Sequence, residues 1–491
     1  MVNRPLHIAI ISAEVSPFSK TGGLADVSNA LPKHVADLGH EVTVVTPYYD
    51  FMAGRPDAPQ HIADISITVG KKEYPLRLYR AKLSQHHSNV LVYFIGNDEL
   101  FGARERLYGY PDDNLRFLIF DQAVFLLYEH LGHIPDIVHC HDWHTGLIPN
   151  ILKIERSKQP LWRDTASVFT IHNLLYQMQG MWYEVPPAKR DTGRGAPPSD
   201  PAKIRTMNMT LRGIRNADAI NAVSVRYAEE IQTKKFGEGL DAALRRRSDR
   251  VFGIINGIDY KIFNPSFDSH LPIHYDWNSL DKKAENKLAF QREHRLSVGK
   301  DIPLIGLVHR LTEQKGFDLI MELLPILLRQ TVQLAIVGNG DRGYVSFFRK
   351  AARQHPDKIA LFTPFTEELE SKIYAASDMF LMPSRYEPCG ISQLKSLRYG
   401  SVPIVHRTGG LADTITDFDP RTGVGTGFVF HNYTGPDLLM ALTRSIETFK
   451  YPRVWEHLTW QAMRQSFSWE LPAKQYVDLY RRAIGTHHAL E

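Results

Sequence analysis

Two cations, Arg310 and Lys315, stand five residues apart just after a β-branched apolar run in LIGLVHRLTEQKG. Cations flanking a turn in this way can neutralise the phosphates of a departing diphosphate. Glu387 follows another apolar run, in MFLMPSRYEPCGISQ, and precedes Gly390. A carboxylate at that position can bind sugar hydroxyls or stabilise cationic character. These residue types indicate a nucleoside diphosphate joined to a neutral, hydroxylated group.

The six letters TGGLAD occur twice, at 21–26 and at 408–413, each time after an apolar run and before a helical pattern. Paired glycines allow a tight turn and close approach to the backbone, and the amides at the start of a helix attract anions. Lys20 precedes the first copy and adds a full charge. We interpret each copy as a turn that exposes its backbone to the same ligand. The amides of Gly390, Ile391 and Ser392 are expected to point at an anion too.

Polar residues also end two apolar runs in the first half of the chain. VHCHDWHTG contains His139, His141, Asp142 and His144, and SVFTIHN ends in His172 and Asn173. Four such groups in six residues allow a metal site, but strand alternation separates them, so we disfavour it. A lone buried histidine is usually structural, whereas His172 follows a strand and is expected at the ligand. No Asp-x-Asp metal clamp is apparent among these motifs, so we expect the cations Lys20, Arg310 and Lys315 in place of Mg²⁺.

These residues need elements that place them together, and the chain supplies strands that alternate with helices. The expected strands are HIAIISAEV, EVTVVTP, VLVYFIG, DIVHCHDW, SVFTIHN and DAINAVS, then LIGLVHRL, QLAIVGNG, IALFTPF, MFLMPS, VPIVHR and GFVFHN. The pattern predicts an α/β fold with two doubly wound parallel sheets. Open parallel sheets bind ligands beyond the carboxyl ends of their strands, and two facing sheets would form a deep interdomain cleft.

A length of 491 residues suits two domains, which we place at 1–255 and 256–469. A helix over about 470–491 is expected to pack back on the first domain. The segment 185–203 is rich in proline, glycine and charge. It is predicted to be a long loop, either a functional one or a plain surface excursion.

Composition excludes several classes of protein. A net charge of +4 over the whole chain argues against nucleic acid, and LRRRSDR at 244–250 is interpreted as a solvated helix face. Two cysteines cannot form a disulfide framework, which favours a reducing, cytoplasmic location. No apolar stretch is long enough to span a membrane.

The motifs SKTGGLADV, HDWHTGL, FTIHN, FGEGLD, GIINGID, RLTEQKGFDLI, PSRYEPCGISQLKSLRYG and RTGGLADT together resemble the bacterial glycogen synthases and plant starch synthases. The resemblance extends from residue 7 to about 430. The resemblance implies a GT-B fold of two Rossmann-like domains. It implies retaining transfer of glucose from ADP-glucose to the non-reducing end of an α-1,4-glucan such as glycogen, with release of ADP and no metal or other cofactor.

The resemblance also assigns roles to individual residues. Glu387, His172, Lys315 and Arg310 match catalytic positions, with Arg310 and Lys315 as the diphosphate clamp. The substrate-binding positions are Lys20, Gly23 and Asp26 at the first turn, Asp142, Asn173 and Asn256 near the glucose, Phe365 beside the adenine, and Cys389, Gly390, Ile391 and Ser392 in the EPCG motif.

Two alternatives stay open. A relative of the same fold could use UDP-glucose or a different acceptor, because one sequence does not reveal the shape of the base pocket. A non-catalytic glucan-binding protein would be expected to have lost Lys315 or Glu387, and both are present.

Overall fold

The computed structural model of the chain describes residues 4–55, 57–84 and 89–489. It divides into two compact units, of which unit 1 comprises 1–256 with 469–491 and unit 2 comprises 257–468. The predicted boundary at 255/256 lies one residue from this division. The cleft predicted between the domains stays a prediction.

Unit 1 is built on a sheet of nine strands in the order β3-β4-β5-β2-β1-β6-β7-β8-β9. The strands are β1 His7–Ile11, β2 Glu41–Pro47, β3 Gln60–Val69, β4 Lys72–Lys82, β5 Leu91–Gly96, β6 Ile137–His141, β7 Ala166–Ile171, β8 Ala219–Ala222 and β9 Val251–Gly253. From β5 to β9 all neighbours pair in parallel. Every residue of β1, β6 and β7 is buried, as expected for strands covered on both faces.

The sheet of unit 1 is mixed at one edge, which the sequence analysis did not predict. β3 and β4 form a hairpin around Gly70, and β4 continues antiparallel to β5. β4 buries every second side chain, Tyr74, Leu76 and Leu78, and exposes Pro75 and Arg77 between them. An edge hairpin with one wet face lacks the continuous apolar run of a covered strand, so a search for such runs misses it.

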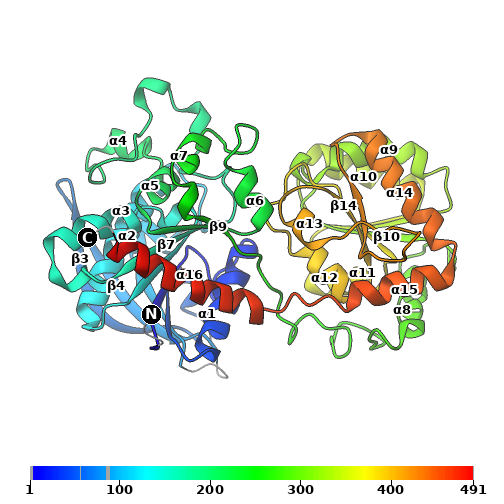
Figure 1. Ribbon diagram of the computed structural model, residues 1–491, viewed down its shortest axis with the longest axis horizontal. Helices are drawn as coiled ribbons and strands as arrows, with labels where there is room; N and C mark the ends of the chain where they lie inside the picture. Colours follow the sequence, from blue (N-terminus) through cyan, green and yellow to red (C-terminus); the bar gives the residue numbers. More distant parts are fainter. Residues whose placement is uncertain (1–3, 56, 85–88, 490–491) are drawn as a thin grey trace. The chain divides into compact units, whose positions relative to one another are not determined.

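Helices cover this sheet on both sides (Figure 1). Those of unit 1 are α1 Gly23–Asp37, α2 Asp113–Leu131, α3 Ile148–Lys158, α4 Pro201–Arg205, α5 Met209–Asn216, α6 Val225–Glu230, α7 Asp241–Arg245 and α16 Glu470–His488. α16, drawn in red, returns from unit 2 and packs on α1, β7 and β8. The predicted helix 470–491 is thus present in unit 1 up to His488, and residues 490 and 491 lie outside the described part.

Unit 2 contains a six-stranded sheet in the order β12-β11-β10-β13-β14-β15, parallel throughout. Its strands are β10 Leu304–Val308, β11 Gln333–Val337, β12 Ile359–Phe362, β13 Met379–Met382, β14 Val402–His406 and β15 Phe428–Phe430. Its helices are α8 Leu280–Glu293, α9 Phe317–Leu327, α10 Arg342–Gln354, α11 Glu367–Ala376, α12 Ser392–Arg398, α13 Gly409–Thr414, α14 Gly435–Phe449 and α15 Pro452–Met463.

Two hydrophobic cores lie on opposite faces of this sheet. In β10, Ile305 and Leu307 belong to the core under α9 and α14, while Leu304 and Val308 belong to the core under α8 and α11. The split follows from the period of two in a strand, which sends successive side chains to opposite faces. The prediction of two α/β domains with parallel sheets is confirmed, with the hairpin of unit 1 as an addition.

Each sheet has a point where the strand order reverses. In unit 1 it lies between β1 and β6, and in unit 2 between β10 and β13. A crevice opens at the carboxyl ends of the strands at such a point, and ligands bind there. The residues that follow these four strands are therefore the first to examine for a site.

Two further observations concern the surface. No helix in the described ranges is both long and apolar enough to cross a membrane. The interpretation of 244–250 as a solvated helix face is wrong in part, because α7 ends at Arg245 and the side chain of Arg247 is half-buried.

Candidate functional site

An ion pair occupies the reversal point of unit 2. Lys315 follows β10 and Glu387 follows β13, and Lys315 Nζ donates to Glu387 Oε2 at 2.5 Å. The side chains are 16% and 7% exposed, so the pair is shielded from water. The structure thus brings together the two residues that the sequence singled out 72 positions apart.

The local backbone explains why the pair forms. Lys315 ends a single turn of 3₁₀ helix, and Gly316 follows with φ of +81°. A Cβ on Gly316 would lie 2.2 Å from the carbonyl oxygen of Pro383, so only glycine lets this turn approach the end of β13. Ser384 Oγ also donates to Glu387 Oε2, at 3.0 Å. Two donors therefore hold the carboxylate oxygen in place.

Arg310 and Phe365 extend the same edge of unit 2. Arg310 follows β10, its side chain is exposed, and it forms no ion pair with any described residue. Phe365 follows β12 and is 44% exposed, which is unusual for a large apolar ring. Between them, His309 is buried, and burial lowers its pKa to about 3, so it stays neutral near pH 7. The edge thus offers an exposed cation and an exposed aromatic ring.

The second TGGLAD does not expose its turn, and our interpretation of it is wrong. Gly409 and Gly410 are buried. A Cβ on Gly409 would lie 1.9 Å from the carbonyl oxygen of Glu387, and one on Gly410 would lie 2.0 Å from that of Cys389. Gly410 N donates to the Glu387 carbonyl at 3.1 Å. This copy is the packing surface against which the EPCG segment rests.

The EPCG segment continues into α12. Gly390 has φ of +71° and leaves room for Gln393, whose Nε2 donates to the carbonyls of Cys389 and Gly390. Cys389 is buried, while Ile391 and Ser392 are half-buried at the start of α12. The predicted residues 389–392 therefore lie in one turn beside the Lys315–Glu387 pair.

The first TGGLAD is open, as predicted. Gly22 and Gly23 are exposed where α1 begins, directly after β1. Glu14, which is almost fully buried, accepts hydrogen bonds from the amide and the hydroxyl of Thr21, and burial raises its pKa. Lys20 Nζ donates to Asp26 Oδ1 at 2.7 Å, with both side chains partly exposed. An incoming anion could thus meet the helix amides and a lysine at the solvent boundary.

Asp142 lies across the reversal point of unit 1, after β6. Its φ is +58°, a conformation that costs a non-glycine residue about 1–3 kcal/mol and is concentrated at functional sites. Asp142 Oδ1 accepts from the amide of His172 at 2.7 Å and from that of Asn173 at 3.4 Å. Burial raises its pKa to about 7, although those two N–H groups oppose the shift. The predicted trio of Asp142, His172 and Asn173 is therefore one hydrogen-bonded unit.

A chain of neutral histidines connects this trio to α16. His172 Nε2 lies 2.9 Å from His141 Nδ1, and the His141 and His139 rings are 4.1 Å apart. His139 in turn lies 2.9 Å from the Tyr480 hydroxyl. Burial lowers the pKa of both His139 and His172 to about 3, and lowers that of His141 as well. Neutral imidazoles make His172 a fixed hydrogen-bonding group rather than a cation.

The disfavoured metal cluster is not assembled. His144 stacks on Trp143, with ring centroids 4.1 Å apart, away from the His139–His141–His172 chain. Among described residues, the group that could share an ion is His7, Glu41 and His133, which does not include these positions. Asn256 is buried at the end of unit 1, and its Oδ1 has no hydrogen-bond partner in the described part of the chain.

Sequence reasoning missed three supporting residues. Glu14 sits at the end of an apolar run, Ser384 is one of many serines, and Tyr480 is 341 residues from His139. Of the three, only Glu14 could have been recognised from the sequence, because a carboxylate that follows a buried strand requires hydrogen-bond donors nearby.

Comparison with known proteins gives the following similarities. Residues 7–246 match the family model "Starch synthase catalytic domain", and residues 291–455 match "Glycosyl transferases group 1". Glycogen synthase of Moorella thermoacetica is 40% identical, covering 99% of each chain. Glycogen synthase of Syntrophotalea carbinolica is also 40% identical, over 99% of this chain and 100% of its own.

Solved structures show the same similarity. The catalytic domain of starch synthase IV from Arabidopsis thaliana, bound to ADP and acarbose, is 30% identical, with a TM-score of 0.85 over 98% of this chain and all of that one. Sucrose-phosphate synthase from Thermosynechococcus elongatus is 18% identical with a TM-score of 0.61 over 98% and 99%, which shows a common fold alone.

Proposed function

The chain belongs to the glycogen synthase family of glycosyltransferases, a group of hexosyltransferases that move a sugar from a nucleotide to a glucan, and on this premise we propose its donor and its chemistry. The donor is ADP-glucose. The acceptor is the non-reducing end of an α-1,4-glucan, and ADP is released. The observation that carries the proposal is the shielded Lys315–Glu387 pair at the reversal point of unit 2.

The negative charge of the departing diphosphate is neutralised by cationic side chains. Arg310 and Lys315 follow the same strand, and each can donate to a phosphate oxygen. A preformed cation in a shielded position, such as Lys315, stabilises charge as it develops, without reorganising water. We therefore propose that no metal takes part. Phe365 offers an exposed ring at the same edge on which adenine can stack. The similar starch synthase IV domain is bound to ADP, and this supports the choice of adenine as the base.

The glucose is held by hydrogen bonds and not by charge alone. His172 is neutral and fixed by His141, and Asn173 has an amide side chain beside it. Glu387 orients the sugar and stabilises positive character at its anomeric carbon. Asp142 fixes the backbone of His172 and Asn173 through its accepted N–H bonds.

The reaction retains the anomeric configuration. The bond from the anomeric carbon to the diphosphate oxygen breaks, and a bond to the acceptor oxygen forms on the same face. The proton of the acceptor hydroxyl passes to the leaving phosphate. Both cysteines are free and buried, which fits the cytoplasm as the proposed compartment.

The test is incorporation of labelled glucose into glycogen, with ADP-glucose and UDP-glucose offered separately, each with and without EDTA. We expect incorporation from ADP-glucose that EDTA leaves unchanged. Incorporation from UDP-glucose alone would overturn the choice of base, and loss of activity with EDTA would overturn the metal-free mechanism. Glycogen binding without turnover of either donor would instead identify a non-catalytic glucan-binding protein.

A further inference from the structure

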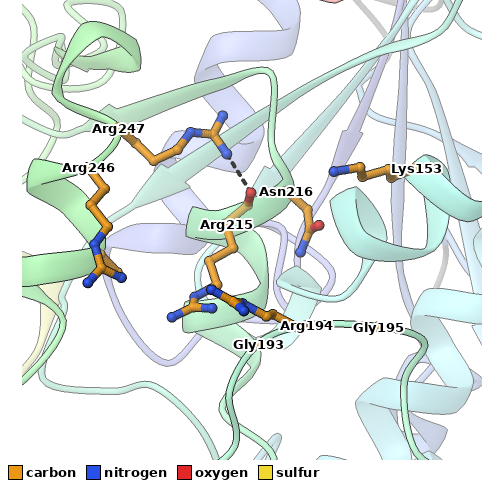
Figure 2. A pocket seen from close by; sticks show the side chains of 9 residues that line it. Lys153, Gly193, Arg194, Gly195, Arg215, Asn216, Arg246 and Arg247 are labelled. Carbon is orange, nitrogen blue, oxygen red and sulfur yellow. Dashed lines mark hydrogen bonds between the residues drawn. The ribbon is translucent and has the colours of Figure 1, made fainter.

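A second group of cations lies in unit 1 and includes none of the residues placed in the site above. Five basic side chains, Lys153, Arg194, Arg215, Arg246 and Arg247, surround a cavity of about 380 Å³, here called the basic pocket (Figure 2). A neighbouring hollow of about 280 Å³ shares Lys153, Arg215 and Arg247 and adds Arg156 and Arg250.

The basic pocket lies at the opposite edge of the sheet from the site. Lys153 is on α3, which leads into the start of β7, and Arg215 is at the end of α5, just before β8. The ends of these helices therefore lie toward the amino ends of the strands. Asp142 and His172, by contrast, follow the carboxyl ends of β6 and β7.

No carboxylate is among the described residues that line the basic pocket. Among the described residues, no carboxylate forms an ion pair with Lys153, Arg194, Arg215 or Arg246. The nearby Asp191 is paired with Arg212. Burial lowers the pKa of Arg215, the charges of Arg194 and Arg246 lower it further, and the charge of Asp191 opposes them. Like charges held together cost free energy that a bound anion would recover.

The predicted loop 185–203 is anchored so that it delivers Arg194 to this group. Asp191 and Arg212 form a buried ion pair at 2.8 Å, with side chains 10% and 4% exposed. Arg212 Nη1 also donates to the carbonyl of Gly195 at 3.1 Å. Gly193, with φ of +68°, is buried, and a Cβ there would lie 2.9 Å from Arg215 Cδ. Arg194 is thus held between two fixed glycines.

The opposite wall is equally fixed. The guanidinium of Arg247 donates to the carbonyls of Ile214, Arg215 and Ala217, which end α5 (Figure 2 draws one of these bonds). Burial lowers the pKa of Arg247, and the charge of Arg250 adds to the effect. Arg247 therefore caps the C-terminal end of α5, and its guanidinium is fixed in place.

We propose that the basic pocket binds a small organic anion that carries two phosphate groups, at a site separate from the donor site. Its volume equals that of about a dozen waters and suits one small molecule. Lys153, Arg194, Arg215 and Arg246 line it together with Arg247, and arginine is the preferred partner of phosphate.

The experiment measures binding of inorganic pyrophosphate by calorimetry to the full chain saturated with ADP, so that any donor site is filled. The test variant is Arg194→Gln with Arg246→Gln, because both side chains are exposed and the change spares the core. The matched control is Lys158→Gln with Arg205→Gln, which removes the same charge from positions outside the basic pocket.

We expect pyrophosphate to bind the wild type and the control alike, and the Kd to rise by about tenfold or more in the test variant. Orthophosphate is expected to bind more weakly than pyrophosphate. No binding to the ADP-saturated wild type, or equal binding to both variants, would overturn the proposal. Binding of a short single-stranded oligonucleotide in preference to pyrophosphate would overturn it as well.

Discussion

The Lys315–Glu387 ion pair is largely buried and lies at the point of unit 2 where the strand order reverses. Replacing Lys315 by alanine removes the cation that we propose faces the leaving phosphate, and it leaves the buried Glu387 carboxylate without its cationic partner. We expect kcat to fall by about 10²–10³-fold, the usual cost of losing one preformed electrostatic contact to the transition state. The measurement is steady-state glucose incorporation at saturating donor.

Lys450→Ala is the control for this change. Lys450 pairs with Glu447 in the same unit, but both side chains are more than half exposed, so the pair contributes little. The kcat of the Lys450→Ala variant is expected to stay within about twofold of the wild-type value. A Lys315→Ala enzyme with equally small loss would contradict the assigned role.

Asp142 predicts a dependence of stability on pH. Burial raises its pKa from 3.8 to about 7, so the folded chain binds a proton between these values that the unfolded chain has released. Protonation of Asp142 therefore contributes its full amount to the free energy of unfolding below pH 4, and this contribution is lost as the pH rises through 7. A shift of roughly three units bounds the change at about 4 kcal/mol.

The Asp142→Asn variant isolates this term. We expect the unfolding free energy of the wild type, minus that of the variant, to fall between pH 4 and 7 and to level off above pH 8. Urea titrations across this range give the difference. A difference that rises with pH would mean that the carboxylate is stabilised in its charged form.

Individual residues of the site were largely predictable, and their contacts were not. Arg310, Lys315 and Glu387 follow recognisable strands, so strand ends alone located them. That Lys315 touches Glu387 depends on β10 pairing with β13, and no local pattern encodes the order of strands in a sheet. Tyr480 was unpredictable for the same reason, because its partner His139 is reached only through the packing of α16.

At the scale of elements, the two copies of TGGLAD are expected to respond oppositely to alanine. Gly409 packs against the Glu387 carbonyl, so Gly409→Ala forces that backbone to move and is expected to cost about 1–3 kcal/mol or more. Gly22 is extended, with φ of −160°, and its Cβ would meet nothing closer than 4.0 Å. Gly22→Ala is expected to cost less than about 1 kcal/mol.

Thermal unfolding of both variants tests this contrast, and donor KM adds a second reading. Gly22→Ala is expected to raise KM with little change in Tm, because we propose that a phosphate of the donor approaches this exposed turn. Equal loss of Tm in both variants would contradict the different roles of the two copies.

Strands were predicted correctly where burial on both faces of the sheet gives them a continuous apolar sequence. The six strands of unit 2 are covered on both faces, so each appears as an apolar run. The β3–β4 hairpin has one wet face and was missed. The second glycine turn was misread because its sequence matches the open copy, while its burial is set by the EPCG segment some twenty residues earlier.

At the scale of the whole molecule, the chain crosses from unit 1 to unit 2 and returns. α16 buries Tyr476, Tyr480 and Ala483 completely, all within unit 1, and supplies the hydroxyl that meets His139. Unit 2, residues 257–468, is continuous in sequence and contains both of its cores. The two units should therefore differ in whether they fold alone.

We expect fragment 257–468 to unfold cooperatively by itself and fragment 1–256 not to do so, because without α16 the side chains on β7, β8 and α1 lose their cover. Adding residues 469–491 as a separate peptide is expected to restore a cooperative transition in 1–256, followed by circular dichroism. A cooperative transition in 1–256 alone would mean that α16 is dispensable for folding, and the returning helix would then serve the His139–His172 chain and not the core.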